Sequence, residues 1–186
     1  NAIIRLLLAQ GARDIIGCGR DGALSGDATE GMHPSRKALA EATNPRHVHG
    51  SLKEVLKGAD VFIGVSSGNI LDPADIETMA DDAIVFALAN PTPEVDPIGA
   101  GKYAAVVATG RSDYPNQINN VLAFPGLFRG LLDAKVKEIT TEVLRVASVA
   151  IASVISEDEL SPSYIIPGAF DKRVAPAVSK AVRRAV

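Results

Sequence analysis

Residues 83–89 read AIVFALA, and every side chain in this stretch is apolar. The same character returns at residues 61–65, VFIGV, and at residues 104–110, AAVVATG. Strands that are apolar along their whole length, rather than at alternate positions, are typical of parallel sheets covered on both faces. The segments between these strands have the spacing of amphipathic helices. The sequence therefore predicts a doubly wound α/β domain with a parallel, Rossmann-like sheet.

The first residues extend this pattern. Residues 1–10, NAIIRLLLAQ, have apolar side chains at helical spacing, and Gly11 supplies a C-terminal stop. RDIIGC at residues 13–18 is predicted to be a further strand of the sheet. Because the chain opens on helix, glycine and strand, it is expected to be truncated before the first strand of a βαβ unit. Further helices are expected at residues 34–42, 51–60, 72–82, 117–132, 137–155 and 173–186.

Composition limits the classes of function. The 186-residue chain is 47% hydrophobic and 22% charged, with a formal net charge of −3 and no basic run, which argues against nucleic-acid binding. The single cysteine, Cys18, cannot form an internal disulfide. No apolar run reaches the ~18 residues that a membrane span requires. A cytoplasmic protein that acts on small molecules is expected.

Small and polar residues follow each predicted strand. These tails are GCGR at 17–20, GVSSG at 64–68, ANPT at 89–92 and TGRSD at 109–113. Ligands of open parallel sheets bind beyond the carboxyl ends of the strands, and small residues let a ligand approach the backbone. Glycine and serine are equally common in ordinary turns, but four such tails at one sheet edge favour a binding cleft.

Amide side chains stand at two of these places. Asn90 precedes Pro91, which favours an extended backbone, so its amide is expected to point outward unless it closes an Asx-type turn. In NQINNVLAFPG, Asn119 and Asn120 are expected in the first turn of a helix, where free N–H groups and the helix dipole favour an anion. The sequence predicts that these amides hold a carboxylate. The alternative is that Asn116 caps the helix and the other two face solvent.

Four longer motifs resemble the bacterial malic enzymes: ADVFIGVS at 59–66, IVFALANPTPE at 84–94, VVATGRSDYPNQINNVLAFPGLFRGLLDA at 106–134 and YIIPGAFDKRVAPAVSKAV at 164–182. The resemblance covers nearly all of the chain, and the run at 106–134 is far more specific than an isolated glycine motif. Malic enzymes oxidise (S)-malate with NAD or NADP and a divalent metal, Mg²⁺ or Mn²⁺, and release CO₂ to give pyruvate. The resemblance implies that residues 1–186 are the C-terminal dinucleotide-binding domain of such an enzyme, without its first strand and glycine-rich loop.

The resemblance also implies roles for individual residues. Asn90, Asn119 and Asn120 are expected to bind malate, and Asn90 and Asn119 also to reach the nicotinamide end of the cofactor. The residues expected along the dinucleotide are Gly64, Val65, Ser66 and Ser67. Neutral amides can position a carboxylate without weakening the pull of a metal on the malate hydroxyl. The family's tyrosine, lysine and acidic metal ligands belong to the N-terminal part, so this chain is expected to hold no catalytic residue or metal ligand and to be inactive alone.

The choice of cofactor depends on the end of the first predicted strand. NAD-selective Rossmann domains place Asp or Glu there to bind the ribose hydroxyls. In this chain the position is Gly19, followed by Arg20. Loss of the carboxylate removes repulsion against a 2′-phosphate, and the Arg20 guanidinium can pair with that phosphate. NADP is therefore favoured over NAD, unless Arg20 is only a solvated turn residue.

Other functions stay open at this point. A regulatory module that binds the dinucleotide without reacting would carry the same domain, and so would a malolactic-type enzyme that converts malate to lactate with bound NAD. A phosphotransacetylase-like domain follows in some bacterial relatives. The family is usually dimeric or larger, so a homodimer or larger assembly is expected. Malate and pyruvate are the expected small-molecule partners, with no nucleic acid and no membrane.

Overall fold

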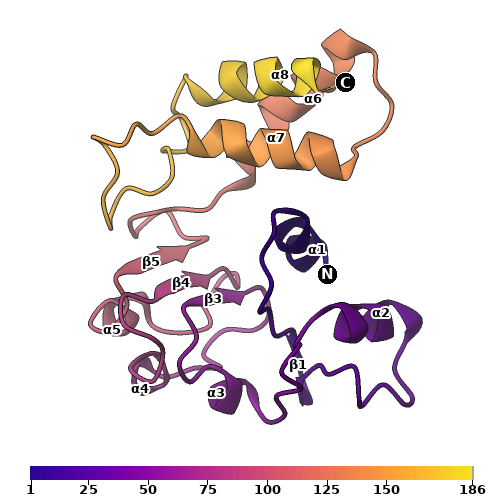
Figure 1. Cartoon of the computed structure of the whole chain (residues 1–186). Helices are drawn as coiled ribbons and strands as arrows, with labels where there is room; N and C mark the ends of the chain where they lie inside the picture. The colour runs from indigo at the N-terminus through magenta and orange to yellow at the C-terminus, as the bar shows by residue number, and fades with distance from the viewer. Residues whose placement is uncertain (186) are drawn as a thin grey trace. The chain divides into compact units, whose positions relative to one another are not determined.

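A computed structural model describes residues 1–185, and Figure 1 shows its helices and strands. The described chain divides into two compact units. The first unit contains Asn1–Ala59 and Thr78–Ala80, and the second contains Asp60–Glu77 and the residues from Asp81 onward. The parallel sheet and the C-terminal helices belong to the second unit, which carries most of the expected site residues.

The second unit contains a parallel sheet in the order β3-β4-β5, formed by β3 (Val61–Gly64), β4 (Ile84–Ala87) and β5 (Val106–Thr109). Gly64 pairs with Ala87, and Ala87 pairs with Thr109, so the three strands end level with one another. Val85 and Ala87, which share one face of the central strand, are fully buried, whereas Ile84 and Phe86 on the other face are partly buried. The predicted α/β class with a parallel sheet is confirmed.

Two short helices connect these strands, α4 (Pro73–Ile76) between β3 and β4, and α5 (Pro97–Ala100) between β4 and β5. Asp96 caps α5, because its carboxylate accepts a hydrogen bond of 2.7 Å from the Gly99 N–H. A side chain on Gly99 would collide with the Pro73 ring, so the two helices lie side by side (Figure 1). These short crossovers keep the strands parallel.

The first unit contains the helices α1 (Ala2–Ala9), α2 (Pro34–Ala42) and α3 (Leu52–Val55), and a hairpin of β1 (Cys18–Gly19) and β2 (Gly22–Ala23). The bounds of α2 agree with the sequence prediction. A small core of Leu24, Leu39 and Ala40 packs against Ile4 and Met32. Because Leu24 directly follows β2, this core anchors the hairpin.

The strand predicted at residues 13–18 is wrong for most of its length. Only Cys18 pairs, in the antiparallel hairpin, and none of these residues joins the three-stranded sheet of the described chain. Their backbone groups are used elsewhere: Ile15 O accepts from the Asn44 N–H and Gly17 O accepts from the Leu24 N–H, both at 2.7 Å. The apolar run correctly indicated a non-helical segment, but strand pairing depends on neighbours that the pattern does not specify.

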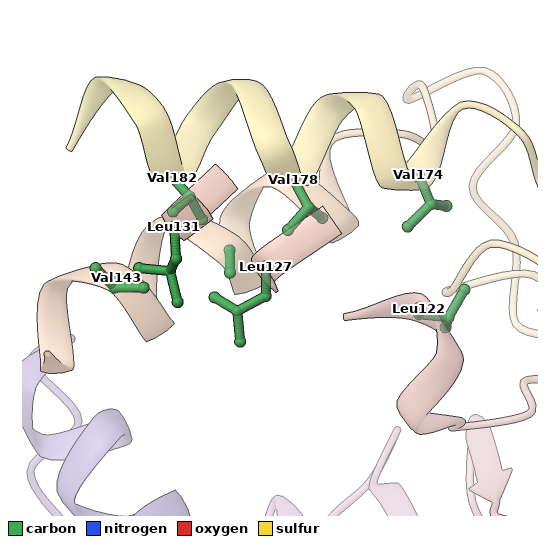
Figure 2. Close-up of a cluster of buried hydrophobic side chains, with 8 residues drawn as sticks. Leu122, Leu127, Leu131, Val143, Val174, Val178 and Val182 are labelled. Atoms are coloured by element: carbon green, nitrogen blue, oxygen red, sulfur yellow. The ribbon is translucent and has the colours of Figure 1, made fainter. Parts of the chain in front are cut away.

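Three helices form the C-terminal part, α6 (Phe124–Ala134), α7 (Thr141–Ala152) and α8 (Val174–Arg184). Figure 2 shows their shared core, which consists of Leu122, Leu127, Leu131, Val143, Ala147, Val174, Val178 and Val182. α6 approaches α8 closely, because a Cβ on Gly126 would lie 2.6 Å from Val178 Cβ and one on Gly130 would lie 2.7 Å from Val182 Cβ. None of the helices within residues 1–185 is long and apolar enough to cross a membrane.

The helix predicted to begin near residue 117 begins later, at Phe124, after a 3₁₀ turn η1 (Asn120–Leu122). Gln117 instead forms a parallel bridge with Thr109, and the Ile118 N–H donates to Thr109 O at 2.8 Å. The segment therefore continues alongside β5 in an extended conformation. Asn119 and Asn120 precede the α-helix, so the prediction that they lie in its first turn is wrong.

Candidate functional site

Three strand tails leave the sheet at one edge. Ser66 and Ser67 follow β3, Asn90 follows β4, and Arg111 follows β5. Because the strands are parallel and end in register, all three tails leave on the same side of the sheet. The side chains of Ser66, Ser67 and Asn90 are exposed there. The structure thus brings the expected cofactor residues of β3 and the expected substrate residue of β4 to one edge.

A buried carboxylate connects two of these tails. Glu94 is 0% exposed; its Oε1 accepts from the Ser66 N–H at 2.8 Å, and its Oε2 accepts from the Ala89 N–H at 2.9 Å. The Ser66 hydroxyl donates to the same Oε1 at 3.4 Å. The nearest backbone bond between the strand ends runs from the Leu88 N–H to Gly64 O, at 3.0 Å. Glu94 therefore joins the tails just beyond the sheet.

The space for this carboxylate exists because residue 64 is glycine. A Cβ on Gly64 would lie 2.6 Å from Glu94 Oε1, closer than side-chain contacts allow. The backbone around Glu94 is held as well, since Asn69 and Leu71 donate their N–H groups to Pro93 O and Glu94 O, each at 2.9 Å. Sequence reasoning missed Glu94. Its only signal is an acidic residue next to a proline-rich turn, which is equally typical of a solvated loop.

Arg111 places a cation next to the loop that follows Asn90. Its Nη1 donates to Pro91 O at 3.4 Å, while its Nη2 pairs with Asp113 Oδ2 at 2.6 Å. The guanidinium carbon also lies 5.7 Å from the centre of the Tyr114 ring. The hydrogen bond from Arg111 lowers the pKa of the Asp113 carboxyl. Arg111 therefore bridges the β5 tail and the β4 tail with its charge largely balanced by Asp113.

The expected malate-binding pair lies on the far side of the β5 tail from Asn90. Asn119 Oδ1 accepts from the Val121 N–H at 3.0 Å and so caps η1, and Asn120 is exposed. Because Gln117 pairs with β5, Asn119 and Asn90 leave the sheet on either side of that strand. The amides share one edge and flank the β5 tail.

Asn116 has a structural role. It is 6% exposed; its Nδ2 donates to Val107 O at 3.1 Å and to Pro162 O at 2.8 Å, and its Oδ1 accepts from the Ile165 N–H at 2.9 Å. Its φ of 56° lies in the left-handed region that asparagine tolerates. The alternative in which Asn116 caps the helix is therefore wrong. The residue fastens the segment before η1 to β5 and to a distant loop.

In the first unit, the expected ribose-binding position lies beside an arginine that sequence reasoning missed. A Cβ on Gly19 would collide with Arg36 Nη2 and would lie 3.0 Å from Arg36 Cζ. Arg36 pairs with Asp21 at 3.4 Å and, with His33, lines a groove next to the hairpin. Arg20 is exposed. The cation that lies against Gly19 is thus Arg36, which is too distant in the sequence for the local motif to reveal it.

Within residues 1–185 no group of three or more His, Cys, Asp or Glu residues could hold a metal ion. His47 Nδ1 and His49 Nε2 pair with Asp27, at 3.6 and 3.1 Å. A hydrogen bond from Ser25 is the main reason why the pKa of Asp27 is lowered, and His49 adds to it. These contacts join exposed side chains at the surface of the first unit.

A parallel α/β sheet with exposed polar tails at its carboxyl edge is typical of the class of α/β domains that bind ligands, including dinucleotides, at that edge. The family described as "Malic enzyme, NAD binding domain" matches residues 6–186, and the chain belongs to this family. The predicted resemblance is confirmed, and with it an enzyme family.

Individual relatives agree with this assignment. The chain is 54% identical to the NAD-dependent malic enzyme of Geobacillus stearothermophilus over 97% of this chain and 38% of that protein. It is 52% identical to the bifunctional malic/malolactic enzyme of Bacillus subtilis over 99% of this chain and 45% of that protein. The crystal structure of the NAD-dependent malic enzyme of Thermotoga maritima matches with a TM-score of 0.92 and 43% identity, over 99% of this chain and 48% of that one. The chain spans less than half the length of each of these relatives.

Proposed function

We propose that this chain is the dinucleotide-binding domain, over residues 1–186, of an enzyme that oxidises (S)-malate with NAD(P) and releases CO₂ to give pyruvate. The family match over residues 6–186 supports this proposal. The observation that carries it is the row of exposed Ser66, Ser67 and Asn90 side chains at the carboxyl edge of the parallel sheet. In open α/β sheets this edge is where nucleotides bind.

The residues at this edge fit a dinucleotide. Gly64 ends β3 without a side chain, and the exposed residue Ser67 offers a hydroxyl group to polar parts of a ligand. Ser66 is exposed as well, and its hydroxyl oxygen can still accept while its proton is donated to Glu94. Val65 is 64% exposed and offers an apolar surface to a flat ring. When bound, the cofactor supplies a two-electron acceptor. The chain's own residues hold and orient it against the substrate.

The amides of Asn90, Asn119 and Asn120 are proposed to position malate. Each Nδ2 group can donate to a carboxylate oxygen, and each Oδ1 can accept from a hydroxyl or carboxamide. Because Asn119 already uses Oδ1 to cap η1, its Nδ2 is the group that faces a ligand in this proposal. Neutral donors orient a dianion without the strong charge pairing that would favour the ground state over the transition state.

The described residues do not fit a divalent metal, because residues 1–185 offer no suitable cluster. The proposal therefore places the ligands of a Mg²⁺ or Mn²⁺ ion, and the groups that move protons, outside this chain. No step proposed for this chain passes through a metal that it binds itself. The isolated chain is accordingly expected to bind a dinucleotide without turning over malate.

NADP is proposed as the preferred cofactor. Gly19 presents no carboxylate to repel a 2′-phosphate, and Arg36 lies directly beside it, with Arg20 next in sequence. Relatives of this chain include NAD-dependent and NADP-dependent malic enzymes. The test compares kcat/KM with NADP and with NAD in the natural full-length protein that contains this chain, as wild type, Arg36→Gln and Arg20→Gln. Arg36→Gln is expected to reduce kcat/KM for NADP about tenfold or more, because a lost hydrogen bond to a charged group costs about 1.5–3 kcal/mol. The value of kcat/KM for NAD is expected to stay nearly unchanged.

A malolactic reaction is the second candidate, because a relative that is 52% identical is named a bifunctional malic/malolactic enzyme. The deciding assay uses the natural full-length protein that contains this chain, with (S)-malate, Mg²⁺ or Mn²⁺, and NAD or NADP. Pyruvate and free reduced cofactor in equal amounts support the malic enzyme reaction. Lactate without free reduced cofactor supports the malolactic one, and cofactor binding without malate turnover supports a regulatory module. The proposed homodimer or larger assembly is checked by light scattering on the same sample.

A further inference from the structure

We propose that Glu94 is a positioning residue that fixes the spacing between the β3 tail and the β4 tail, and so the placement of Ser66 relative to Asn90. This inference goes beyond the malate reaction and rests on it for the roles of the two tails. Glu94 touches neither ligand in this proposal. It acts through the backbone groups of Ser66 and Ala89.

The geometry of the carboxylate carries the inference. One oxygen accepts from the Ser66 N–H at 2.8 Å, and the other accepts from the Ala89 N–H at 2.9 Å. Because the two oxygens belong to one rigid, planar group, they hold the two N–H donors at a set separation. Glu94 continues the connection between β3 and β4 beyond the backbone bond from Leu88 to Gly64.

The surroundings keep the carboxylate in this place. Glu94 is 0% exposed, and its backbone O and that of Pro93 are fixed by N–H donors from the segment that follows β3. Gly64 leaves just the space that the carboxyl group occupies. A buried polar group that loses a hydrogen-bond partner costs free energy, so the loss of either contact is unfavourable.

The consequence for function follows from sequence adjacency. Ala89 precedes Asn90, and Ser66 precedes Ser67, so a shift in either N–H moves a residue proposed to face a ligand. A misplacement of about 1 Å in an oriented reaction can cost roughly 100-fold in rate. Changes at Glu94 are therefore expected to impair the use of malate more than they impair folding.

The test uses Glu94→Gln in the natural full-length protein. The glutamine keeps the volume, but its NH₂ group cannot accept, so one of the two N–H bonds is lost. The KM for malate is expected to rise about tenfold or more. Val143→Ala is the matched control, because Val143 is equally buried but belongs to the helical core. At a similar loss in Tm, the control is expected to keep KM for malate within about twofold of wild type.

Gly64→Ala is a second variant that displaces the carboxylate without altering it. It is expected to raise KM for malate in the wild-type background and to add little in the Glu94→Ala background, since both changes break the same contact. The inference is overturned if Glu94→Gln and Gly64→Ala both leave KM as in the Val143→Ala control. It is also overturned if Glu94→Ala and Gly64→Ala raise KM for malate independently, so that the effects multiply in the double variant.

A measurement without substrate separates this inference from the proposed reaction. The amide proton signals of Ser66 and Ala89 are recorded by NMR in the ligand-free protein, and at least one is expected to move in Glu94→Gln. Unchanged signals for both would overturn the inference whatever the activity. A wild-type protein without malate turnover would contradict the proposed reaction alone. In that case the Kd values of NADP and NAD replace KM, and an unchanged Kd in Glu94→Gln would overturn the positioning role.

Discussion

The edge of the sheet and the C-terminal helices belong to the same compact unit, yet they are held together in opposite ways. At the edge, buried polar groups join distant segments: Glu94 bonds two strand tails, and Asn116 bonds β5 to the loop around Pro162. Between the helices, glycines and branched apolar side chains interlock. Hydrogen bonds fix direction and distance, whereas apolar packing is non-directional. The comparison teaches that both regions stabilise the unit, but only the polar edge fixes distant segments at set positions.

The largest effect is expected from Asn116→Ala, which removes the polar link between β5 and the distant loop. The substitution leaves Val107 O, Pro162 O and the Ile165 N–H without their partner and places alanine at a φ of 56°. Lost partners at about 1–3 kcal/mol each, reduced by access of water, and backbone strain together predict about 3–4 kcal/mol of destabilisation. Urea denaturation measures the change. Asn120→Ala, at an exposed position, is the control, and equal losses for the two variants would contradict the assignment.

A somewhat smaller loss is expected when the apolar core is opened. Leu131 is 6% exposed and its neighbour Leu132 is 73% exposed, so the two leucines differ in burial but not in chemistry. Leu131→Ala is expected to cost about 3 kcal/mol, through lost burial and the cavity left behind. Leu132→Ala is expected to stay within about 0.5 kcal/mol of wild type. Denaturant midpoints of the two variants check this, and neither is expected to alter cofactor binding.

The next prediction concerns the same apolar core, but it adds a side chain at the contact between α6 and α8 instead of removing one. A Cβ on Gly126 would lie 2.6 Å from Val178 Cβ and 2.7 Å from Ala175 O, so Gly126→Ala forces α6 and α8 apart. The expected cost is about 1–3 kcal/mol, partly offset by the helix propensity of alanine. Gly168→Ala, where a Cβ would meet open space, is the control. Thermal unfolding distinguishes them: a Gly126→Ala protein as stable as Gly168→Ala would show that the helices do not approach this closely.

The smallest effect is expected from the exposed ion pair beside the Asn90 loop. The pKa of Asp113 is lowered mainly by the hydrogen bond from Arg111. A lowered pKa stabilises the folded state above the unfolded value of about 3.9, and this stabilisation is lost as the pH falls through the folded pKa. Arg111→Met is therefore expected to be slightly less stable than wild type near pH 7, with the difference vanishing in acid. Urea midpoints at several pH values test this; a difference that grew in acid would contradict it.

The fold could be predicted where the signal is local. Apolar strands at residues 61–65, 83–89 and 104–110 and the helix Pro34–Ala42 carry their own patterns, and the structure has them close to the predicted bounds. The strand at residues 13–18 and the helix start near residue 117 failed because both depend on pairing with another segment. Gln117 is held extended by Thr109, and no local propensity reveals that contact.

The candidate site likewise contains residues that could be predicted from the sequence and residues that could not. The tails with Ser66, Ser67 and Asn90 could be located because they follow recognisable strands. Glu94 and Arg36 could not, because each acts on a segment that is distant in the sequence, and a charged residue in a polar stretch is ordinarily solvated. The roles of Asn119 and Asn120 stay predictions; the structure relocates them from the first turn of the α-helix to the start of the 3₁₀ turn η1.

The close approach of α6 to α8 has an evolutionary consequence. Gly126 faces Val178 and Gly130 faces Val182, so each glycine and its valine share one fixed volume. A larger residue on α6 is tolerable only where the opposing residue on α8 becomes smaller. Among diverging homologues, positions 126 and 178, and likewise 130 and 182, are therefore expected to covary as coupled pairs rather than drift one at a time.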